Sequence, residues 1–286
     1  MVVHLVRIAA ITISIIVCTF LPFLPGRYDG FAVTLSAIAQ LFGIAGLLLV
    51  PIGVLWLIYE LRKRALIHGT LSRKDKGYYF AIASVGALSI LASVVSIFAF
   101  ASSFSLGFIT LALWIYGVSR IVPRLKLLKN AEVGVFTPTP LYLIFVPIVV
   151  ALFQFALVGP ATEFSRNYAI KKSAELINDI EEYHRANGRY PKSLLSLWED
   201  YDPSVIGIER FHYELHGDAY NLFFEQFRLH PLGTREIVMY SKLDEHFIAA
   251  HNMDRLTWIG EELEARQGYY AVYDASRPHW KYFWFD

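Results

Sequence analysis

Five long apolar segments dominate the first part of the chain. A helix needs about 20 mostly apolar residues to cross a bilayer, and the first and fourth segments reach that length only with flanking residues. The pattern therefore predicts about five membrane spans within residues 1–159. The segments run from Ile8 to Leu24, Phe31 to Tyr59, Tyr78 to Ala101, Leu106 to Val122 and Leu141 to Val158.

The first apolar segment has two interpretations. Arg7 followed by an apolar run is typical of a cleaved signal peptide as well as of a membrane span. The residues Leu24-Pro25-Gly26-Arg27 do not form the small-residue motif at which signal peptides are cut. We therefore expect a retained span.

From Thr162 to Gly188 the pattern changes to that of an amphipathic helix with a water-facing side. Apolar side chains recur every three or four positions, and the predicted apolar face consists of Ile170, Ala174, Ile177 and Ile180 or Tyr183. Thr162 or Ser165 can cap its start, and Asn187-Gly188 can end it. Gly159-Pro160 predicts a break from the preceding span, because proline removes a helical hydrogen bond.

After this helix the sequence predicts mainly strands. Tyr190-Pro191 favours an extended step, after which Pro191 can open a short helix. The segment FHYELHGDAYNLFFEQF alternates and turns at Gly217-Asp218, which indicates a hairpin. EIVMYS, YYAVYDAS and HWKYFWFD predict further strands, and DRLTWIGEELEARQG predicts a helix. Residues 160–286 are therefore expected to form an α+β domain, helix first and antiparallel sheet afterwards.

The charge is distributed unevenly along the chain. Residues 1–159 hold 12 Lys and Arg against 4 Asp and Glu, a net charge of +8, whereas residues 160–286 hold 14 against 21, a net charge of −7. Such asymmetry indicates two regions in different environments. Because the basic charge lies beside apolar segments, its expected partner is membrane lipid and not nucleic acid.

The basic residues also predict the orientation. Segments 62–76 and 120–129 hold most of them, whereas the alternate loops, PGRYDG and ASSFSLG, hold only Arg27. Positive charge is retained on the cytoplasmic side. This predicts a multi-pass protein with a cytoplasmic amino terminus and an extracytoplasmic domain after Val158, most simply in a bacterial inner membrane.

The predicted spans contain few side chains that could take part in transport or catalysis. Their apolar cores contain no Asp, Glu, Lys, Arg or His, which disfavours ion-coupled transport. Gln40, Thr110 and Gln154 are expected to hold helices together, and Gly43 to allow close helix contact. The only cysteine, Cys18, lies in an apolar segment and can form no intrachain disulfide.

One part of the chain resembles a known family. An apolar span that continues into an amphipathic helix, then NGRYPKSLLSL, then the hairpin FHYELHGDAYNLFF, resembles the globular part of type II secretion pseudopilins and other pilin-like proteins. The resemblance covers roughly Leu141 to Phe227 and implies a long helix packed on an antiparallel sheet. In that family the span follows a cleaved leader and carries a glutamate near its new amino terminus, whereas here it is internal and has no acidic residue. The resemblance therefore implies a pilin-like domain and not a pilus subunit.

His212, Glu214 and His216 form the strongest candidate site. Alternate residues of a strand share a face, so two imidazoles and a carboxylate could bind zinc. The simpler interpretation is a solvated face opposite Phe211, Tyr213 and Leu215. His246 and His251 are five residues apart, which does not fit two ligands on one helix face. The aromatic tail from His279 is expected to pack in the core.

We therefore expect a non-catalytic integral membrane protein: a bundle of about five spans, residues 1–159, with an extracytoplasmic α+β domain, residues 160–286. Its expected role is binding, sensing or scaffolding, with a protein partner in the membrane or envelope. The sequence contains no phosphate-binding loop, nucleophile elbow or paired zinc cysteines, so we assign no catalytic, cofactor-binding or metal residues and no cofactor. The alternative is a membrane-anchored metal-dependent hydrolase that uses His212, Glu214 and His216.

Overall fold

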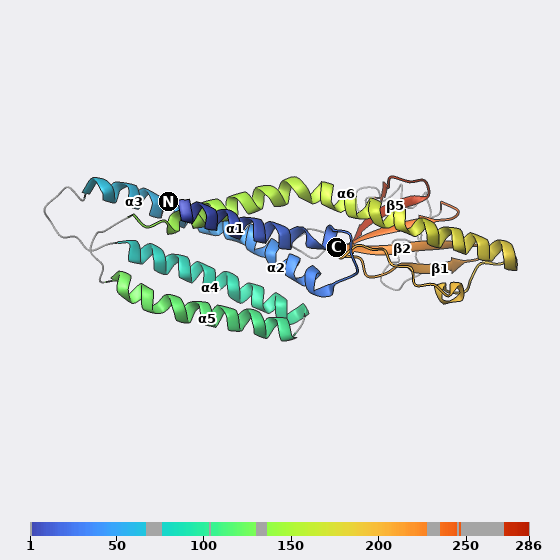
Figure 1. The fold of residues 1–286 in the computed structure, drawn as a ribbon, viewed down its shortest axis with the longest axis horizontal. Helices are drawn as coiled ribbons and strands as arrows, with labels where there is room; N and C mark the ends of the chain where they lie inside the picture. Colours follow the sequence, from blue (N-terminus) through green and yellow to red (C-terminus); the bar gives the residue numbers. More distant parts are fainter. Residues whose placement is uncertain are drawn as a thin grey trace. The chain divides into compact units, whose positions relative to one another are not determined.

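The computed structural model describes residues 2–66, 76–102, 104–129, 136–227, 235–244, 246 and 272–285. Within them the helices are α1 (Val2–Phe20), α2 (Gly30–Gly46), α3 (Val50–Leu66), α4 (Gly77–Ser102), α5 (Phe104–Lys129) and α6 (Thr139–Asn187) (Figure 1). Five helical stretches in these ranges are long and apolar enough to cross a membrane. Each of the five predicted apolar segments overlaps one of them over most of its length.

The chain divides into two compact units. The first comprises Met1–Thr19 and Thr34–Ala156, and the second comprises Phe20–Val33 and Leu157–Asp286. The division near residue 157 lies close to the predicted boundary. The segment between the first two spans, residues 20–33, groups with the second unit, which was not predicted.

In the first unit the second span is not one uniform helix. A short 3-10 turn, η2 (Leu47–Leu49), joins α2 to α3, and the whole stretch from Gly30 to Lys63 is long enough for one crossing. Gly43 allows α6 to approach α2, because a Cβ at this position would lie 2.4 Å from Gln154 Oε1. The amide of Gln154 also donates to the Ala39 carbonyl at 3.5 Å. Gly43 and Gln154 thus have the helix-packing roles expected of them.

A buried acidic residue lies one position beyond the second predicted span. Glu60 is 1% exposed and accepts hydrogen bonds from Trp56 Nε1 at 3.3 Å and from the backbone N–H of Thr137 at 3.1 Å. Lys63 Nζ lies 3.5 Å from the same carboxylate. A buried charge needs such partners, so this group links α3 to the segment that precedes α6.

The second unit is built on a five-stranded antiparallel sheet. The strands are β1 (His212–His216), β2 (Ala219–Phe227), β3 (Arg235–Ser241), β4 (Val272–Asp274) and β5 (Trp280–Phe285), in the spatial order β1-β2-β3-β5-β4. The predicted hairpin is confirmed, with Gly217 at a φ of +54° in its turn. The other predicted strands are also present, whereas the helix predicted from DRLTWIGEELEARQG lies outside the described residues.

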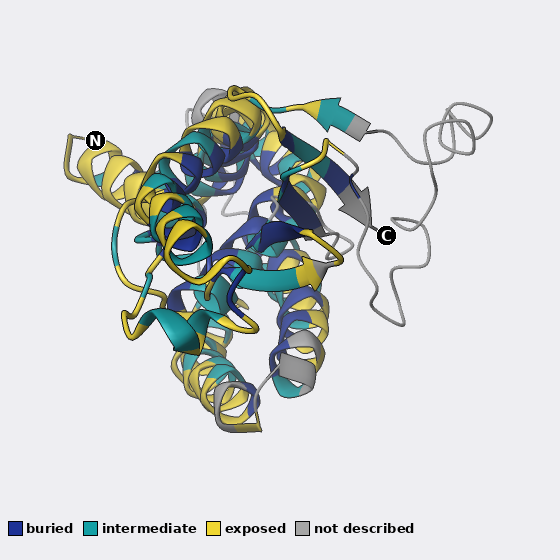
Figure 2. Cartoon of the chain, turned by 90° about the vertical axis from the view of Figure 1, so that its right-hand side faces the viewer, coloured by how far each residue is buried: buried dark blue, intermediate teal, exposed yellow. Residues whose placement is uncertain are grey.

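The part of α6 that belongs to the second unit packs on one face of this sheet (Figure 1). The core between them contains Leu176 and Ile180 from α6 and Tyr220, Leu222 and Phe224 from β2, each fully buried. Figure 2 shows the central strands in the dark blue of buried residues. Trp280 of the aromatic tail belongs to this core, as predicted.

The buried stripe of α6 differs from the predicted one. Ile170 and Ile180 are buried as expected, but Ser173 and Leu176 are the fully buried residues between them, whereas Ala174 and Ile177 are half-buried. Ser173 can occupy the core because its hydroxyl donates to the Ile170 carbonyl at 2.8 Å. A serine therefore lies on the packed face, which a hydrophobicity pattern cannot show.

The predicted break at Gly159-Pro160 is wrong, because α6 runs without interruption from Thr139 to Asn187. Pro160 removes one backbone hydrogen bond, but membrane helices tolerate this loss because side chains and neighbours satisfy the freed groups. Thr162 Oγ1 donates to the Val158 carbonyl at 2.7 Å, so this predicted cap lies inside the helix. The predicted end is correct: Gly188 follows Asn187 with a φ of +68°.

Tyr190 and Pro191, the step after α6, are both buried. The Pro191 carbonyl accepts a hydrogen bond from the Tyr213 hydroxyl at 2.8 Å, which ties the step to β1. The short helix that follows is the 3-10 turn η3 (Leu194–Leu197), and Ser193 occupies its N-cap position. Pro191 therefore does not open this helix.

Residues 22–29 pair with residues 204–207 in the second unit, and we call this pairing the clip. Pro25 and Val205 form an antiparallel bridge, and four backbone hydrogen bonds of 2.7–3.0 Å join the two segments. Phe23 is 2% exposed, and its ring centroid lies 6.0 Å from that of Phe227. Gly207 is needed here, because a Cβ would lie 2.7 Å from the Pro22 carbonyl oxygen. The clip is therefore part of the packed structure of the second unit.

Candidate functional site

A polar cavity of about 670 Å³ lies in the second unit. Residues 158–167 of α6 form one wall, and Glu236 of β3, Tyr282 of β5 and the segment from Asp274 to Ser276 complete it. The volume falls within the range of about 300–1,000 Å³ that is typical of small-molecule sites. The wall formed by α6 begins where the last apolar segment ends.

A buried ion pair forms the floor of the cavity. Arg166 Nε donates to Glu236 Oε1 at 2.8 Å, and Nη2 donates to Oε2 at 3.1 Å. The side chains of Arg166 and Glu236 are only 10% and 1% exposed. The two-pronged geometry matches the fork of the guanidinium to both carboxylate oxygens, so the pair is held rigidly.

Tyr282 lies against the same guanidinium. The Cζ atom of Arg166 is 3.6 Å from the centroid of the Tyr282 ring. The negative face of an aromatic ring attracts a cation, and this attraction is stronger where water is excluded. Tyr282 in turn stacks on Tyr273, with ring centroids 5.1 Å apart. The Tyr282 ring of β5, backed by Tyr273 of β4, therefore packs against the Arg166 guanidinium.

Further polar groups surround the ion pair. Gln226 Nε2 donates to the Thr162 carbonyl at 2.8 Å, and Ser276 Oγ donates to Asn167 Oδ1 at 2.6 Å. Within the described part of the chain, the buried atoms Gln226 Oε1 and Ser165 Oγ have no hydrogen-bond partner. Buried polar atoms are usually paired, but neither of these residues lines the cavity.

The rim of the cavity is acidic. Glu163 and Asp274 are exposed lining residues, and with Glu236 they give three carboxylates against the single guanidinium of Arg166, a formal charge of −2. An opposite charge close to a surface of this kind is favoured, and a like charge is disfavoured. The site is therefore suited to a cationic or neutral polar group more than to an anion.

The predicted zinc-binding face lies elsewhere, on β1. His212 stacks on Phe223, with ring centroids 4.9 Å apart, and Glu214 pairs in register with Asn221. Burial, followed by the nearby charge of Arg210, lowers the pKa of His212. The side chain of His216 lies outside the described residues, so the three-residue site stays a prediction. Within the described ranges, no group of three His, Cys, Asp or Glu side chains is placed to hold a metal ion.

His246 is held by backbone groups. Its Nδ1 and Nε2 atoms each lie 3.1 Å from a carbonyl oxygen, that of Asp244 and that of His279 respectively. Burial lowers the pKa of His246, and the hydrogen bond to His279 opposes this shift. His246 therefore links β5 to the end of β3, whereas His251 lies outside the described residues.

The Arg166–Glu236 pair was not predicted from the sequence. The sequence did contain a signal for Glu236. Glu236 lies two residues before Val238, a core residue of β3, so the two side chains share a face of the strand. A charged residue in phase with buried ones predicts a buried partner. Nothing local identified that partner as Arg166, which lies 70 residues earlier in the sequence.

Comparisons of the chain with protein-family models, curated proteins and solved structures found no match.

Proposed function

We propose that the chain is a non-catalytic integral membrane protein whose second unit binds a protein partner outside the cytoplasm, in the membrane or the envelope. The five apolar helical stretches are compatible with insertion in a membrane. The uneven distribution of basic residues supports a cytoplasmic amino terminus and, most simply, a bacterial inner membrane. Membrane lipid is then the partner of the first unit.

The acidic cavity above the Arg166–Glu236 pair carries this proposal. The pair and Tyr282 form a rigid floor, and the exposed carboxylates Glu163 and Asp274 form the rim. A Lys or Arg side chain of the partner would place its charge between the rim carboxylates. The guanidinium of Arg166 is already neutralised by Glu236, so it does not oppose a cation strongly. Binding of a basic or neutral partner also agrees with the net charge of −7 over residues 160–286.

The pilin-like resemblance supports a scaffolding form of this role. A long helix followed by an antiparallel hairpin, in this chain order, is what the resemblance implies. We therefore propose a pilin-like domain anchored by several spans, with its binding surface near the start of its helix.

Site-specific photocrosslinking in intact cells tests the proposed binding site. A photoreactive residue at Ser276, on the rim, should give a discrete adduct with one protein, and one at Asp218, in the exposed hairpin turn, should not. Mass spectrometry should place a Lys or Arg of the partner at the crosslink. Reversing the charge of Glu163 and Asp274 to Lys should reduce the adduct at least tenfold, whereas Glu199→Lys, a matched change at another exposed carboxylate, should leave it intact. Equal adducts from both positions, or an adduct that survives the double reversal, would contradict the proposal.

Reporter fusions test the proposed orientation separately. Fusions after Lys76 and Lys129 should report the cytoplasm, and fusions after Ser165 and at Asp286 should report the exterior. A cytoplasmic signal at Asp286 would overturn the orientation and leave the polar cavity in contact with cytoplasmic partners.

A further inference from the structure

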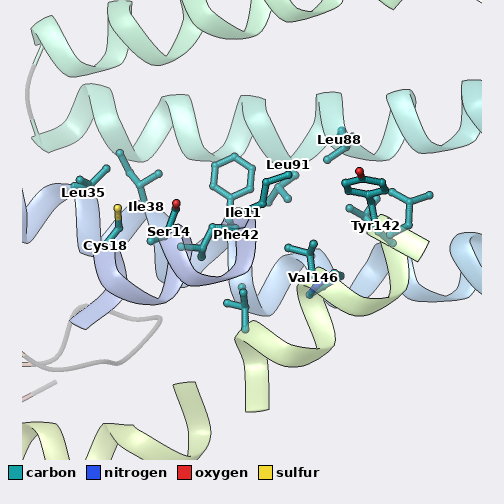
Figure 3. A pocket seen from close by; sticks show the side chains of 18 residues that line it. Ile11, Ser14, Cys18, Leu35, Ile38, Phe42, Leu88, Leu91, Tyr142 and Val146 are labelled. Atoms are coloured by element: carbon teal, nitrogen blue, oxygen red, sulfur yellow. The ribbon is translucent and has the colours of Figure 1, made fainter. Parts of the chain in front are cut away.

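A second cavity, of about 480 Å³, lies within the first unit. Side chains from α1, from α2 with η2, from α4 and from α6 line it, and each of these helices belongs to a stretch that is long and apolar enough to cross a membrane (Figure 3). Its size is within the range of ligand sites in proteins, about 300–1,000 Å³. The cavity is separate from the acidic site of the second unit and shares no residue with it.

The lining selects for hydrocarbon. Of the 18 lining residues, only Ser14, Cys18 and Tyr142 carry polar side-chain atoms. The hydroxyl of Tyr142 lies 3.0 Å from His4 Nδ1, so it already has a polar partner. An apolar cavity of this kind does not hold ordered water, which needs two to four polar partners. The occupant must therefore fill space with apolar groups.

The cavity is long and narrow. Figure 3 shows its labelled side chains in a row, from Leu35 and Cys18 at one end to Leu88 and Tyr142 at the other. On the second span the lining extends from Leu35 to Leu49, which corresponds to roughly 21 Å at 1.5 Å per residue. A volume of about 480 Å³ spread along this length is enough for one carbon chain.

We propose that this cavity binds one acyl chain of a membrane phospholipid. An empty space of this size would deprive its lining of dispersion contacts, because protein interiors are otherwise close-packed. The lining helices lie in hydrocarbon when they are inserted in a membrane, so lipid acyl chains are the apolar groups that surround them. The long axis of the cavity follows the helices. One leaflet of the hydrocarbon core is about 15 Å deep, so a single chain from one leaflet fits within the length of the cavity.

Mass measurement of the full chain released from detergent micelles tests the site. The wild-type chain should retain one phospholipid after washing that removes surface lipid. Ser14→Phe, which introduces a ring at the lining, should lower the retained fraction at least fivefold. Ala10→Phe is the matched control, because Ala10 is an exposed small residue of α1 outside the lining. Equal retention by both variants would overturn the proposal, and a retained fatty acid or other molecule of different mass would overturn the assignment to phospholipid.

A second measurement uses only the wild-type chain and does not depend on the folding of a variant. A phospholipid with a photoreactive group on its acyl chain is incorporated with the full chain into nanodiscs and activated by light. Adducts should concentrate on α1 between Ile11 and Cys18, at several times the yield on Leu113 and Ile115 of α5, which are exposed and lie outside the lining. In addition, bound phospholipid should slow alkylation of Cys18, the only cysteine in the chain, several-fold in micelles. Adducts spread evenly over all exposed positions, with no protection of Cys18, would show surface lipid only and refute the site.

Discussion

Removing Arg166 should destabilise the second unit strongly, because the buried Glu236 carboxylate loses both hydrogen bonds that the guanidinium donates to it. That carboxylate is 1% exposed and accepts two hydrogen bonds from the guanidinium, at 2.8 and 3.1 Å. Breaking a buried ion pair by removing one partner costs about 3–5 kcal/mol. We expect the loss for Arg166→Met to fall in this range, since Met replaces the apolar stem of the side chain and supplies no donor.

Changing Glu236 should destabilise the second unit less than removing Arg166. In Glu236→Gln the amide oxygen can still accept one hydrogen bond, and Arg166 keeps its place over the Tyr282 ring and borders the cavity. A hydrogen bond to a charged group contributes about 1.5–3 kcal/mol, which sets the expected loss. Replacing the pair together, as Arg166→Met with Glu236→Leu, should restore stability to within about 1 kcal/mol of the wild type, because no buried charge is left alone.

Hydrogen exchange followed by mass spectrometry on the full chain in micelles measures these differences where they arise. Amides of β2 and β3 report the opening of the sheet, and every 1.4 kcal/mol corresponds to a tenfold faster exchange. Arg166→Met should therefore accelerate exchange about 100-fold or more, and the double variant by less than about tenfold. If the double variant exchanges as fast as Arg166→Met, the loss comes from packing around α6 and not from the missing partner of the buried carboxylate.

Three further predictions concern the second unit. Phe23→Ala should destabilise it by about 3–5 kcal/mol in hydrogen exchange, because Phe23 is buried in the clip, whereas Phe31→Ala, at an exposed position, should change it by less than about 1 kcal/mol. Leu176→Ala should lower the stability of the second unit by about 2–5 kcal/mol, and Glu175→Ala should leave it almost unchanged. The reverse order would contradict the burial of Leu176 on the packed face of α6. Because burial lowers the pKa of His212 in the folded state, the unfolded state takes up a proton first as the pH falls below about 6.5, so the melting temperature should fall between pH 7 and 5. His212→Gln should reduce this dependence, and an unchanged slope would remove His212 as its source.

Much of the fold could be predicted because its signals are local. Apolar segments identify spans by length alone, and alternation around Gly217-Asp218 identifies the first hairpin together with its register. The continuity of α6 through Pro160 could not be predicted in this way, because the cost of proline depends on which groups satisfy the freed carbonyl. The shift of the buried stripe to Ser173 has a similar cause, since a serine whose hydroxyl is bonded to its own helix behaves as a small core residue.

The candidate site could not be predicted from the sequence, for a different reason. Arg166 and Glu236 meet only because α6 packs on β3, and the pairing of distant charges follows from tertiary packing. The histidine pattern on β1 was visible because strand spacing is local, yet His212 uses its ring to stack on Phe223. Local spacing therefore indicated which side chains share a face, but it did not show which of them border a cavity.

The clip changes how the second unit is connected to the membrane. A domain that followed the last span alone would be joined to the first unit at one point, the helix that passes through residue 157. Because residues 20–33 also belong to the second unit, the chain passes between the units three times: after Thr19, after Val33 and after Ala156. The backbone hydrogen bonds of residues 22–29 to residues 204–207 make the added segment a structural part of that unit. The covalent chain therefore joins the two units at the end of α1 and near the start of α2 as well as within α6, which a single stalk would not do.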